Sequence, residues 1–250
     1  MEKIDKKILD YINLKKTVTT LQLCDEFQIS ESSCRRALRK LDDKRLIARY
    51  FGGANSIEKI QNSTDVVIRF NQYDIQKDRI AKRSVESILP GSTIILLGGT
   101  TVFRICKYIK RLKITVITNS MLIFNELCEC QDITLILLGG QYNRSEAELI
   151  GLLTISNSKI FICDYMFMGT NGYITNLGFT TDDIKAVELY SWCMTVANKT
   201  YVVVDSSKFH SRGKYIIAPI KEVSSVITDS GISKNIEQEL IKNNIEVLIT

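Results

Sequence analysis

The chain has 250 residues, of which 45% are hydrophobic, and a formal net charge of +5. This length and apolar content are enough for one large domain, or for a medium domain with a small one. No stretch approaches the roughly 20 uninterrupted apolar residues that a membrane span needs, and the N-terminal MEKIDKKILD lacks the apolar core of a signal peptide. We therefore expect a cytoplasmic protein.

The seven cysteines are an odd number in a chain without a secretion signal, which argues against a disulfide framework. Cys128 and Cys130 resemble half of a zinc site. His210 is the single histidine, however, and there is no second closely spaced cysteine pair, so a zinc site is poorly supported. We expect the cysteines to be small buried apolar residues, and we expect no metal and no cofactor.

The first residues of the chain contain three short helical patterns. Apolar residues recur at helical spacing in IDKKILDYIN, and Thr19 or Thr20 is placed to cap a second helix, TLQLCDEF. Ser30 can cap a third helix, ESSCRRALRKLDDK, after the turn QIS. We expect the buried stripe of this third helix at Cys34, Ala37 or Leu38, and Leu41.

The remaining face of the third helix is basic and is followed by a strand and a glycine turn, LIARYFGGAN, which is typical of a wing. Residues 1–57 hold 12 Lys and Arg against 8 Asp and Glu, so most of the excess positive charge lies here. Two short helices, a tight turn and a basic helix indicate a winged helix-turn-helix that reads DNA in the major groove. The alternative is a small helical bundle with a solvated basic face. The candidate DNA-binding residues are Ser32, Ser33, Arg35, Arg36, Arg39, Lys40 and Arg49.

A polar stretch without clear periodicity follows, and helical patterning resumes before Pro90 and Gly91. We therefore expect a DNA-binding domain over residues 1–57, a linker over 58–72 and a larger domain over 73–250.

From residue 92 onward, apolar runs alternate with amphipathic segments. This pattern predicts an α/β fold with a mainly parallel sheet that is covered on both faces. Ligands of such sheets bind beyond the carboxyl ends of the strands. The expected strands are residues 93–97, 114–118, 133–138, 201–205, 225–228 and 246–250, and the expected helices are residues 100–112, 120–128, 182–199 and 233–244.

The phrase LLGGTT, residues 96–101, ends the first of these strands. The two glycines permit close backbone approach, and Thr100 or Thr101 can cap the next helix, whose free N–H groups suit a phosphate or another anion. Neither a dinucleotide fingerprint nor a Walker motif is present. A plain capped turn is the alternative interpretation. A second copy, LLGGQY at residues 137–142, lacks the hydroxyls, and we expect it to line the same edge without being the main anion site.

The segment ISESSCRRALRKLDDKRLIARYFGGA resembles the N-terminal signature of the DeoR-type transcriptional regulators. Arg35 and Arg36 match a pair of arginines in that signature, Arg49 matches the arginine of the wing, and GGA closes the motif. Ala37 stands where the family usually has aspartate, Cys34 replaces an isoleucine, and Phe51 replaces a histidine.

The resemblance continues through GGTT, TNSMLIF, LLGGQYN, DYMFMGTNGYITNLGFT, VVVDSSKF and ITD, and so spans nearly the whole chain. It implies a larger domain that resembles ribose-5-phosphate isomerase and binds a phosphorylated sugar. Lys208 would be the cation for its phosphate. Leu97 departs from the family aspartate, and Val102 from a third threonine. The effector residues that the resemblance implies are Gly98, Gly99, Thr100, Thr101, Asn119, Ser120, Gly139, Gly140, Asp164, Gly169, Gly172, Asp205 and Lys208.

We therefore expect a regulator rather than an enzyme: a repressor that binds operator DNA and a sugar-phosphate effector as a homo-oligomer, either a dimer or a tetramer. A sugar-phosphate isomerase with a DNA-binding head is the first alternative, because Asp164, Glu188, Asp205 and Lys208 could supply a base and a helper. A DNA-binding architectural protein that senses nothing is the second.

Overall fold

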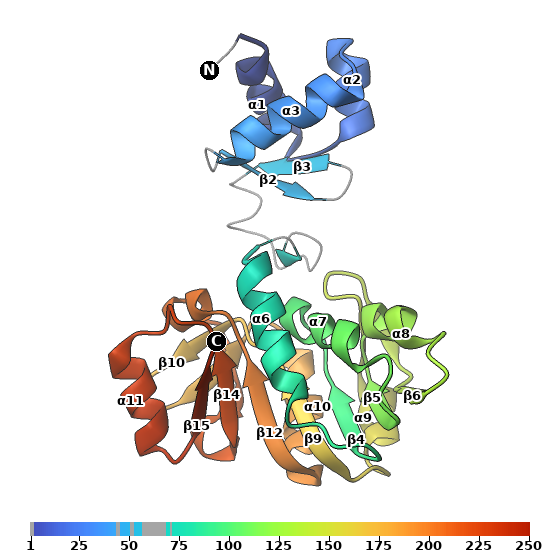
Figure 1. The fold of residues 1–250 in the computed structure, drawn as a ribbon, viewed down its shortest axis with the longest axis vertical. Coiled ribbons are helices and arrows are strands. Elements are labelled where there is room, and N and C mark those ends of the chain that lie inside the picture. The colour runs from blue at the N-terminus through green and yellow to red at the C-terminus, as the bar shows by residue number, and fades with distance from the viewer. Residues whose placement is uncertain (1–2, 44–45, 51–52, 57–68, 71) are drawn as a thin grey trace. The chain divides into compact units, whose positions relative to one another are not determined.

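A computed structural model describes residues 3–43, 46–50, 53–56, 69–70 and 72–250 of the chain. Its residues divide into two compact units, Met1–Gln72 and Tyr73–Thr250 (Figure 1). The predicted linker, 58–72, lies outside the described residues except at positions 69, 70 and 72, and Phe51 lies outside them as well.

The smaller unit contains the three predicted helices and the predicted strand that follows them. Two strands were not predicted: β1, which comes before the second helix, and β3, which begins where a glycine turn was expected. They join β2 in an antiparallel sheet of order β1-β3-β2. The elements are α1 (Lys3–Lys15), β1 (Thr17–Thr19), α2 (Thr20–Phe27), α3 (Glu31–Asp43), β2 (Ile47–Tyr50) and β3 (Gly53–Ser56).

Side-chain caps fix where α2 and α3 begin. The Thr19 hydroxyl accepts from the Gln22 amide at 3.1 Å while the Gln22 side chain accepts from the Thr19 amide at 2.8 Å, which is a capping box. The Ser30 hydroxyl accepts from the Ser33 amide at 3.3 Å. These caps set the register in which α3 buries the predicted stripe, Cys34, Ala37, Leu38 and Leu41, against α1 and α2.

The larger unit is built on a seven-stranded parallel sheet of order β15-β14-β12-β9-β4-β5-β6. All six predicted strands are present. The strand that was not predicted, β9, lies between β12 and β4 in the middle of the sheet. The bounds are β4 (Thr93–Leu96), β5 (Ile114–Thr118), β6 (Ile133–Leu137), β9 (Cys163–Met168), β12 (Ala197–Val203), β14 (Ser225–Thr228) and β15 (Glu246–Ile249).

Helices cover both faces of this sheet, as the continuous apolar strands predict (Figure 1). Ile94 and Leu96 of β4 pack under α6 (Asp74–Val85), α7 (Thr100–Ile109) and α8 (Met121–Leu127). Ile95 and Leu97 face the opposite layer, so Leu97, which departs from the family aspartate, belongs to the core. That layer contains α9 (Leu152–Ser158), α10 (Ile184–Val196), α11 (Lys234–Lys242) and the antiparallel sheet β10 (Gly172–Ile174), β11 (Gly178–Thr181) and β13 (Tyr215–Pro219).

Four short elements complete the unit. A hairpin of β7 (Gln141–Asn143) and β8 (Glu148–Ile150) follows β6, and the 3-10 helices are η1 (Ser206–His210) and η2 (Ile220–Glu222). None of the helices described is long and apolar enough to cross a membrane.

The order of the strands creates a switch point between β4 and β9. From β4 the chain builds outward through β5 and β6, and from β9 it builds outward in the other direction through β12, β14 and β15. Crossover connections therefore diverge beyond the carboxyl ends of β4 and β9, and ligands of open α/β sheets bind in the crevice at this place.

All seven cysteines are free thiols. Burial raises the pKa of Cys34, Cys106, Cys163 and Cys193 to about 12. Cys128 is exposed, which contradicts the expectation that every cysteine is buried.

A thiol-labelling experiment checks this assignment. At pH 8 a maleimide should modify Cys128 of the native protein first, while Cys106 and Cys193 should react only after unfolding, because their thiols are shielded and remain protonated. Peptide mass mapping against time reports the order. Reaction of Cys106 or Cys193 as fast as Cys128 would show that their helices are not packed as described.

Candidate functional site

The residues predicted to bind an effector gather at the carboxyl edge of the parallel sheet. Because neighbouring strands are parallel, the segments that follow them meet at the same edge. These segments are 98–101 after β4, 119–120 after β5, 139–140 after β6, 169 after β9, and 205–208 after β12.

Two predicted residues are explained in another way. Asp164 is the second residue of β9, and its carboxylate accepts from the Thr93 amide at 2.8 Å, at the amino edge of the sheet. It lies at the opposite ends of the strands, so its prediction as an effector residue is wrong. Gly172 is the first residue of β10, and a Cβ there would lie 2.3 Å from the Ser211 carbonyl oxygen. The close packing of β10 against the backbone at Ser211 therefore requires a glycine.

The loop after β4 lies at the switch point. Gly99 has a φ of 126° and is the N-cap residue of α7, so the prediction of a threonine cap is wrong. A Cβ on Gly169 would meet the Gly98 carbonyl oxygen at 3.7 Å, which shows how closely the ends of β4 and β9 approach. Thr100 and Thr101 are buried in the first turn of α7.

A buried lysine joins this loop from α6. The Lys77 ammonium donates to the Thr100 hydroxyl at 3.0 Å, and Lys77 is only 3% exposed. It therefore places a lysine side chain beside the partial positive charge at the start of α7. Lys77 was not predicted as a site residue, because only the fold reveals its contact with Thr100, which lies 23 positions away in sequence.

Ion pairs and a hydrogen bond between side chains of α6 and α7 hold the helix that carries Lys77 in place. Asp78 accepts from the Tyr108 hydroxyl at 2.7 Å and from the Lys107 ammonium at 2.9 Å. These two hydrogen bonds hold the pKa of the Asp78 carboxyl below its usual value. Arg104 also donates to Asp74. The two helices are thus fastened together on their outer side.

Glu148 is a second buried charge that was not predicted. It is 6% exposed and accepts from the Asn119 side-chain amide at 3.2 Å. Gly98 lies against it, since a Cβ on Gly98 would be 1.6 Å from Glu148 Oε1. The hairpin that carries Glu148 is joined to the segment after β5 by the Leu149 amide, which donates to the Asn119 carbonyl at 2.7 Å.

The second glycine pair lies at the same edge, and it leads into the β7–β8 hairpin instead of a helix. Gly140 has a φ of 155°, and a Cβ there would be 2.0 Å from the Thr154 hydroxyl of α9. Close packing, in addition to backbone freedom, therefore requires this glycine. Ser120 caps α8 at this edge, where its hydroxyl accepts from the Ile123 amide at 3.5 Å.

The segment after β12 turns through η1. Asp205 is 1% exposed and accepts from the Ser207 hydroxyl, and Lys208 follows in the same turn. The carboxylate of Asp229, at the end of β14, accepts from the Ser206 amide at 2.7 Å. These bonds order the loop that carries Lys208.

In the smaller unit, the charged residues of α3 differ in their contacts. Arg35 pairs with Glu31 at 2.7 Å, and Lys40 lies 4.0 Å from Asp5 of α1. Arg36 and Arg39 are exposed and have no ion-pair partner among the described residues. Ser32 and Ser33 form hydroxyl contacts with Ser30 at the start of α3. The side chain of Arg49, in β2, lies outside the described residues.

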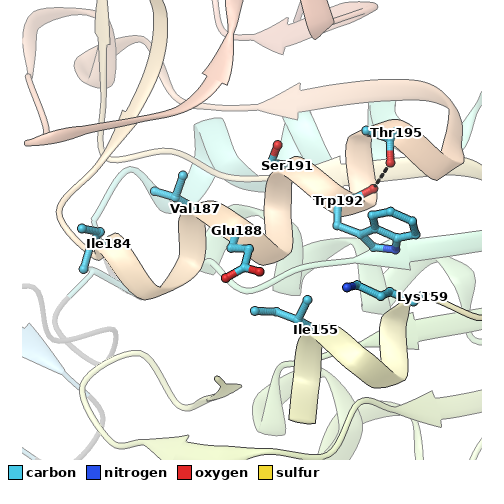
Figure 2. Close-up of a pocket in the computed structure, with 8 residues that line it drawn as sticks. All are labelled: Ile155, Lys159, Ile184, Val187, Glu188, Ser191, Trp192 and Thr195. Atoms are coloured by element: carbon cyan, nitrogen blue, oxygen red, sulfur yellow. Dashed lines mark hydrogen bonds between the residues drawn. The ribbon is translucent and has the colours of Figure 1, made fainter. Parts of the chain in front are cut away.

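A pocket of about 460 Å³ lies elsewhere, between α9 and α10 (Figure 2). Figure 2 shows the Lys159 ammonium next to the Trp192 ring. The Lys159 Nζ atom lies 5.6 Å from the centroid of that ring. None of the predicted effector residues lines it. The lining residues are Ile155, Lys159, Ile184, Val187, Glu188, Ser191, Trp192 and Thr195.

The groups that an isomerase would need are not gathered in one place. Asp164 is at the amino edge, Glu188 is in the α9–α10 pocket, and Asp205 is bonded within its own loop. Among the described residues, no three His, Cys, Asp or Glu side chains are grouped to hold a metal ion.

Comparison with known proteins identifies the family. Residues 73–230 match the DeoR C terminal sensor domain, and residues 5–60 match the DeoR-like helix-turn-helix domain. The chain belongs to the DeoR family. This confirms the resemblance found in the sequence and the winged helix-turn-helix followed by a mainly parallel α/β domain.

DeoR-family relatives align along nearly the whole chain. An uncharacterized HTH-type transcriptional regulator of Bacillus subtilis, YulB, is 28% identical over 95% of this chain and 93% of its own. The lactose phosphotransferase system repressor of Lactococcus lactis is 30% identical over 91% of each. Both are regulators by name, which supports the expectation that this chain is not an enzyme.

Among solved structures, ribose 5-phosphate isomerase from Plasmodium falciparum matches 54% of this chain and 53% of its own at 19% identity, with a TM-score of 0.39.

A glycine substitution tests the packing at the switch point. Gly98→Ala should lower the free energy of unfolding by about 1–3 kcal/mol, because the new methyl group would overlap Glu148. Gly169→Ala is the matched control, since its methyl group would find only ordinary contacts, the nearest at 3.7 Å. Denaturant unfolding of both variants compares them, and equal stability of the two would contradict this packing.

Proposed function

We propose that this protein is a repressor of carbohydrate-metabolism genes, and that a phosphorylated sugar or sugar derivative binds residues 73–250 and modulates operator binding. In this proposal residues 1–57 bind DNA, residues 58–72 are the linker, and the protein acts in the cytoplasm, where operator DNA lies. The relative named as a lactose phosphotransferase system repressor supports both the repression and the link to sugars.

The observation that carries the effector proposal is the convergence of 98–101, Asn119 and Gly169 at the switch point of the sheet. The first turn of α7 presents N–H groups there, and Lys77 adds a buried ammonium at Thr100. A phosphate suits this environment, because charge-assisted hydrogen bonds to an anion are the stronger kind. Lys208, on the ordered turn η1, is proposed as the further cation.

The DNA-binding proposal rests on α3. Arg36 and Arg39 are exposed on its polar face and keep their guanidinium groups available. An arginine fork can donate two hydrogen bonds to guanine in the major groove. Lys40 lies near Asp5, so we assign it to fastening α1 and α3 together as well as to a phosphate contact.

We also propose a homo-oligomer, since helix-turn-helix proteins bind paired half-sites as symmetric assemblies. The proposed interface between two copies is the apolar face around the α9–α10 pocket, where the exposed side chains are Leu152, Leu153, Ile160, Ile162 and Ile184. Lys159 and Glu188 carry opposite charges in this pocket, so a two-fold contact can pair them across the interface.

Light scattering coupled to gel filtration tests this interface. Ile160→Asp with Ile162→Asp should convert the wild-type oligomer to a smaller species, because both side chains are about 80% exposed in one copy and would be buried in the oligomer. Leu89→Asp, on an exposed leucine outside this face, is the control. An unchanged mass for the double variant would exclude this face.

Arg36→Ala should weaken specific operator binding by about 1–3 kcal/mol, the range for an arginine that contacts a base. Arg35→Ala should have the smaller effect, because the Arg35 side chain is engaged by Glu31. Fluorescence anisotropy with an operator obtained by in vitro selection, at fixed salt, measures both. Arg111→Ala removes an exposed arginine from the larger unit and serves as the control. Wild-type affinity for the Arg36 variant would remove α3 as the recognition helix.

Sugar phosphates should raise the melting temperature of the wild-type protein, since a ligand at 100 times its Kd stabilises the native state by about 2.7 kcal/mol. The panel is glucose 6-phosphate, fructose 1-phosphate, ribose 5-phosphate and inorganic phosphate. The double variant Thr100→Val with Thr101→Val should fold and bind DNA but lose this shift, since it removes two hydroxyls from the first turn of α7.

Loss of the Thr100 hydroxyl removes one hydrogen bond of Lys77 and should lower the free energy of unfolding by about 1.5–3 kcal/mol. A domain of typical stability remains folded after a loss of this size. Thr175→Val changes an exposed threonine between β10 and β11 and is the matched control. A full wild-type shift in the double variant would place the phosphate elsewhere.

A further inference from the structure

The carboxyl edge of the sheet contains a second polar cluster, next to the loop proposed to hold the phosphate. It is formed by Asn119, Glu148 and Thr154, and all three side chains are more than nine-tenths buried. Asn119 donates to Glu148 at 3.2 Å and to the Leu149 carbonyl at 3.2 Å. The Thr154 hydroxyl lies beside Gly140. Gly140 also lies close to the backbone of Ile150, the last residue of β8.

Two atoms of this cluster have no hydrogen-bond partner within the described part of the chain. They are the Asn119 side-chain oxygen and the Thr154 hydroxyl. The orientation of the Asn119 amide is fixed by its neighbours, because a flipped amide would turn its oxygen toward the Glu148 carboxylate. Buried polar groups are normally satisfied, and exceptions at a ligand site are accounted for by the ligand.

The cluster therefore offers two acceptor groups, a carboxylate and an amide oxygen, and one hydroxyl that can accept or donate. The carboxylate repels a phosphate, whereas all three groups can form hydrogen bonds with the hydroxyl groups of a ligand. The first turn of α7, two residues beyond Gly98, offers donors instead. The polarity of the edge thus reverses across the loop 98–100, where Glu148 Oε1 lies against Gly98.

Building on the proposed function, we infer that Asn119, Glu148 and Thr154 form the end of the effector site that recognises the hydroxyl groups of the sugar, while the phosphate binds at the start of α7. The ligand class is then a sugar phosphate with free hydroxyls at the end remote from its phosphate. Glu148 selects among sugars, and inorganic phosphate fills only the other end.

Thr154→Val tests the inference with least disturbance of the fold. Valine has nearly the shape of threonine, and the lost hydroxyl has no partner among the described residues, so the stability of the ligand-free protein should not fall. The affinity for the sugar phosphate should fall about 3–10-fold, the equivalent of one neutral hydrogen bond. Isothermal titration of the full-length protein measures it.

Glu148→Gln should lower the affinity for the sugar phosphate about 10–100-fold, because it replaces a charged acceptor with a neutral one. The affinity for inorganic phosphate should stay equal or become stronger. Thr195→Val, in the α9–α10 pocket, is the matched control and should change neither affinity. Circular dichroism and the ligand-free melting temperature establish that each variant is folded.

The outcomes separate this inference from the function on which it rests. If no sugar phosphate in the panel binds the wild-type protein, the proposed function fails, and the inference fails with it. If the wild type binds a sugar phosphate but Thr154→Val and Glu148→Gln bind it equally well, only the inference is overturned. A parallel loss of sugar-phosphate and inorganic-phosphate affinity would also overturn it, because the cluster would then only shape the loop.

Discussion

The close approach of the chain at the ends of β4 and β9 is the constraint on which the proposed site depends. Gly98 lies between the Glu148 carboxylate and the backbone at Gly169, with no space for a side chain on its Glu148 side. This contact brings a loop, a helix start and a hairpin to one place, although they are distant in sequence. Gly99 then turns the chain into α7, so that N–H groups point into the same region.

Two buried charges approach this loop from different elements. Lys77 reaches it from α6 and Glu148 from β8, and neither is more than 6% exposed. Burying charges is unfavourable unless other interactions compensate, and clusters of such groups often mark functional sites. The fastening of α6 to α7 through Asp78 and Tyr108 keeps the ammonium in place without using the proposed ligand.

Much of the fold could be predicted from the sequence because its signals are local. The apolar runs identified six of the seven strands of the parallel sheet, and the caps of α2 and α3 followed from Thr19 and Ser30. The strand β9 was missed because polar Asp164 and Tyr165 follow its first residue, Cys163, and leave no clean apolar run. The three-residue strands of the hairpins are too short to give a periodic pattern.

The candidate site was predictable only in outline. The glycine pairs signalled the carboxyl edge, but Asp164 was assigned to it without knowledge of its strand position, and Lys77 and Glu148 depend on contacts across the fold. The buried positions of Ala37 and Leu97 explain how the chain accommodates two departures from the family pattern, since both side chains pack in apolar cores.

Hydrogen exchange of the full-length protein, with and without a saturating sugar phosphate, tests the central claim most directly, because it locates the ligand without any substitution. The account predicts slower exchange in the peptides that contain residues 98–101 and 119–120, at the carboxyl edge of the sheet. Protection confined to the peptides of α9 and α10 that contain Ile155 and Trp192 would contradict it, since the ligand would then occupy the pocket away from the switch point.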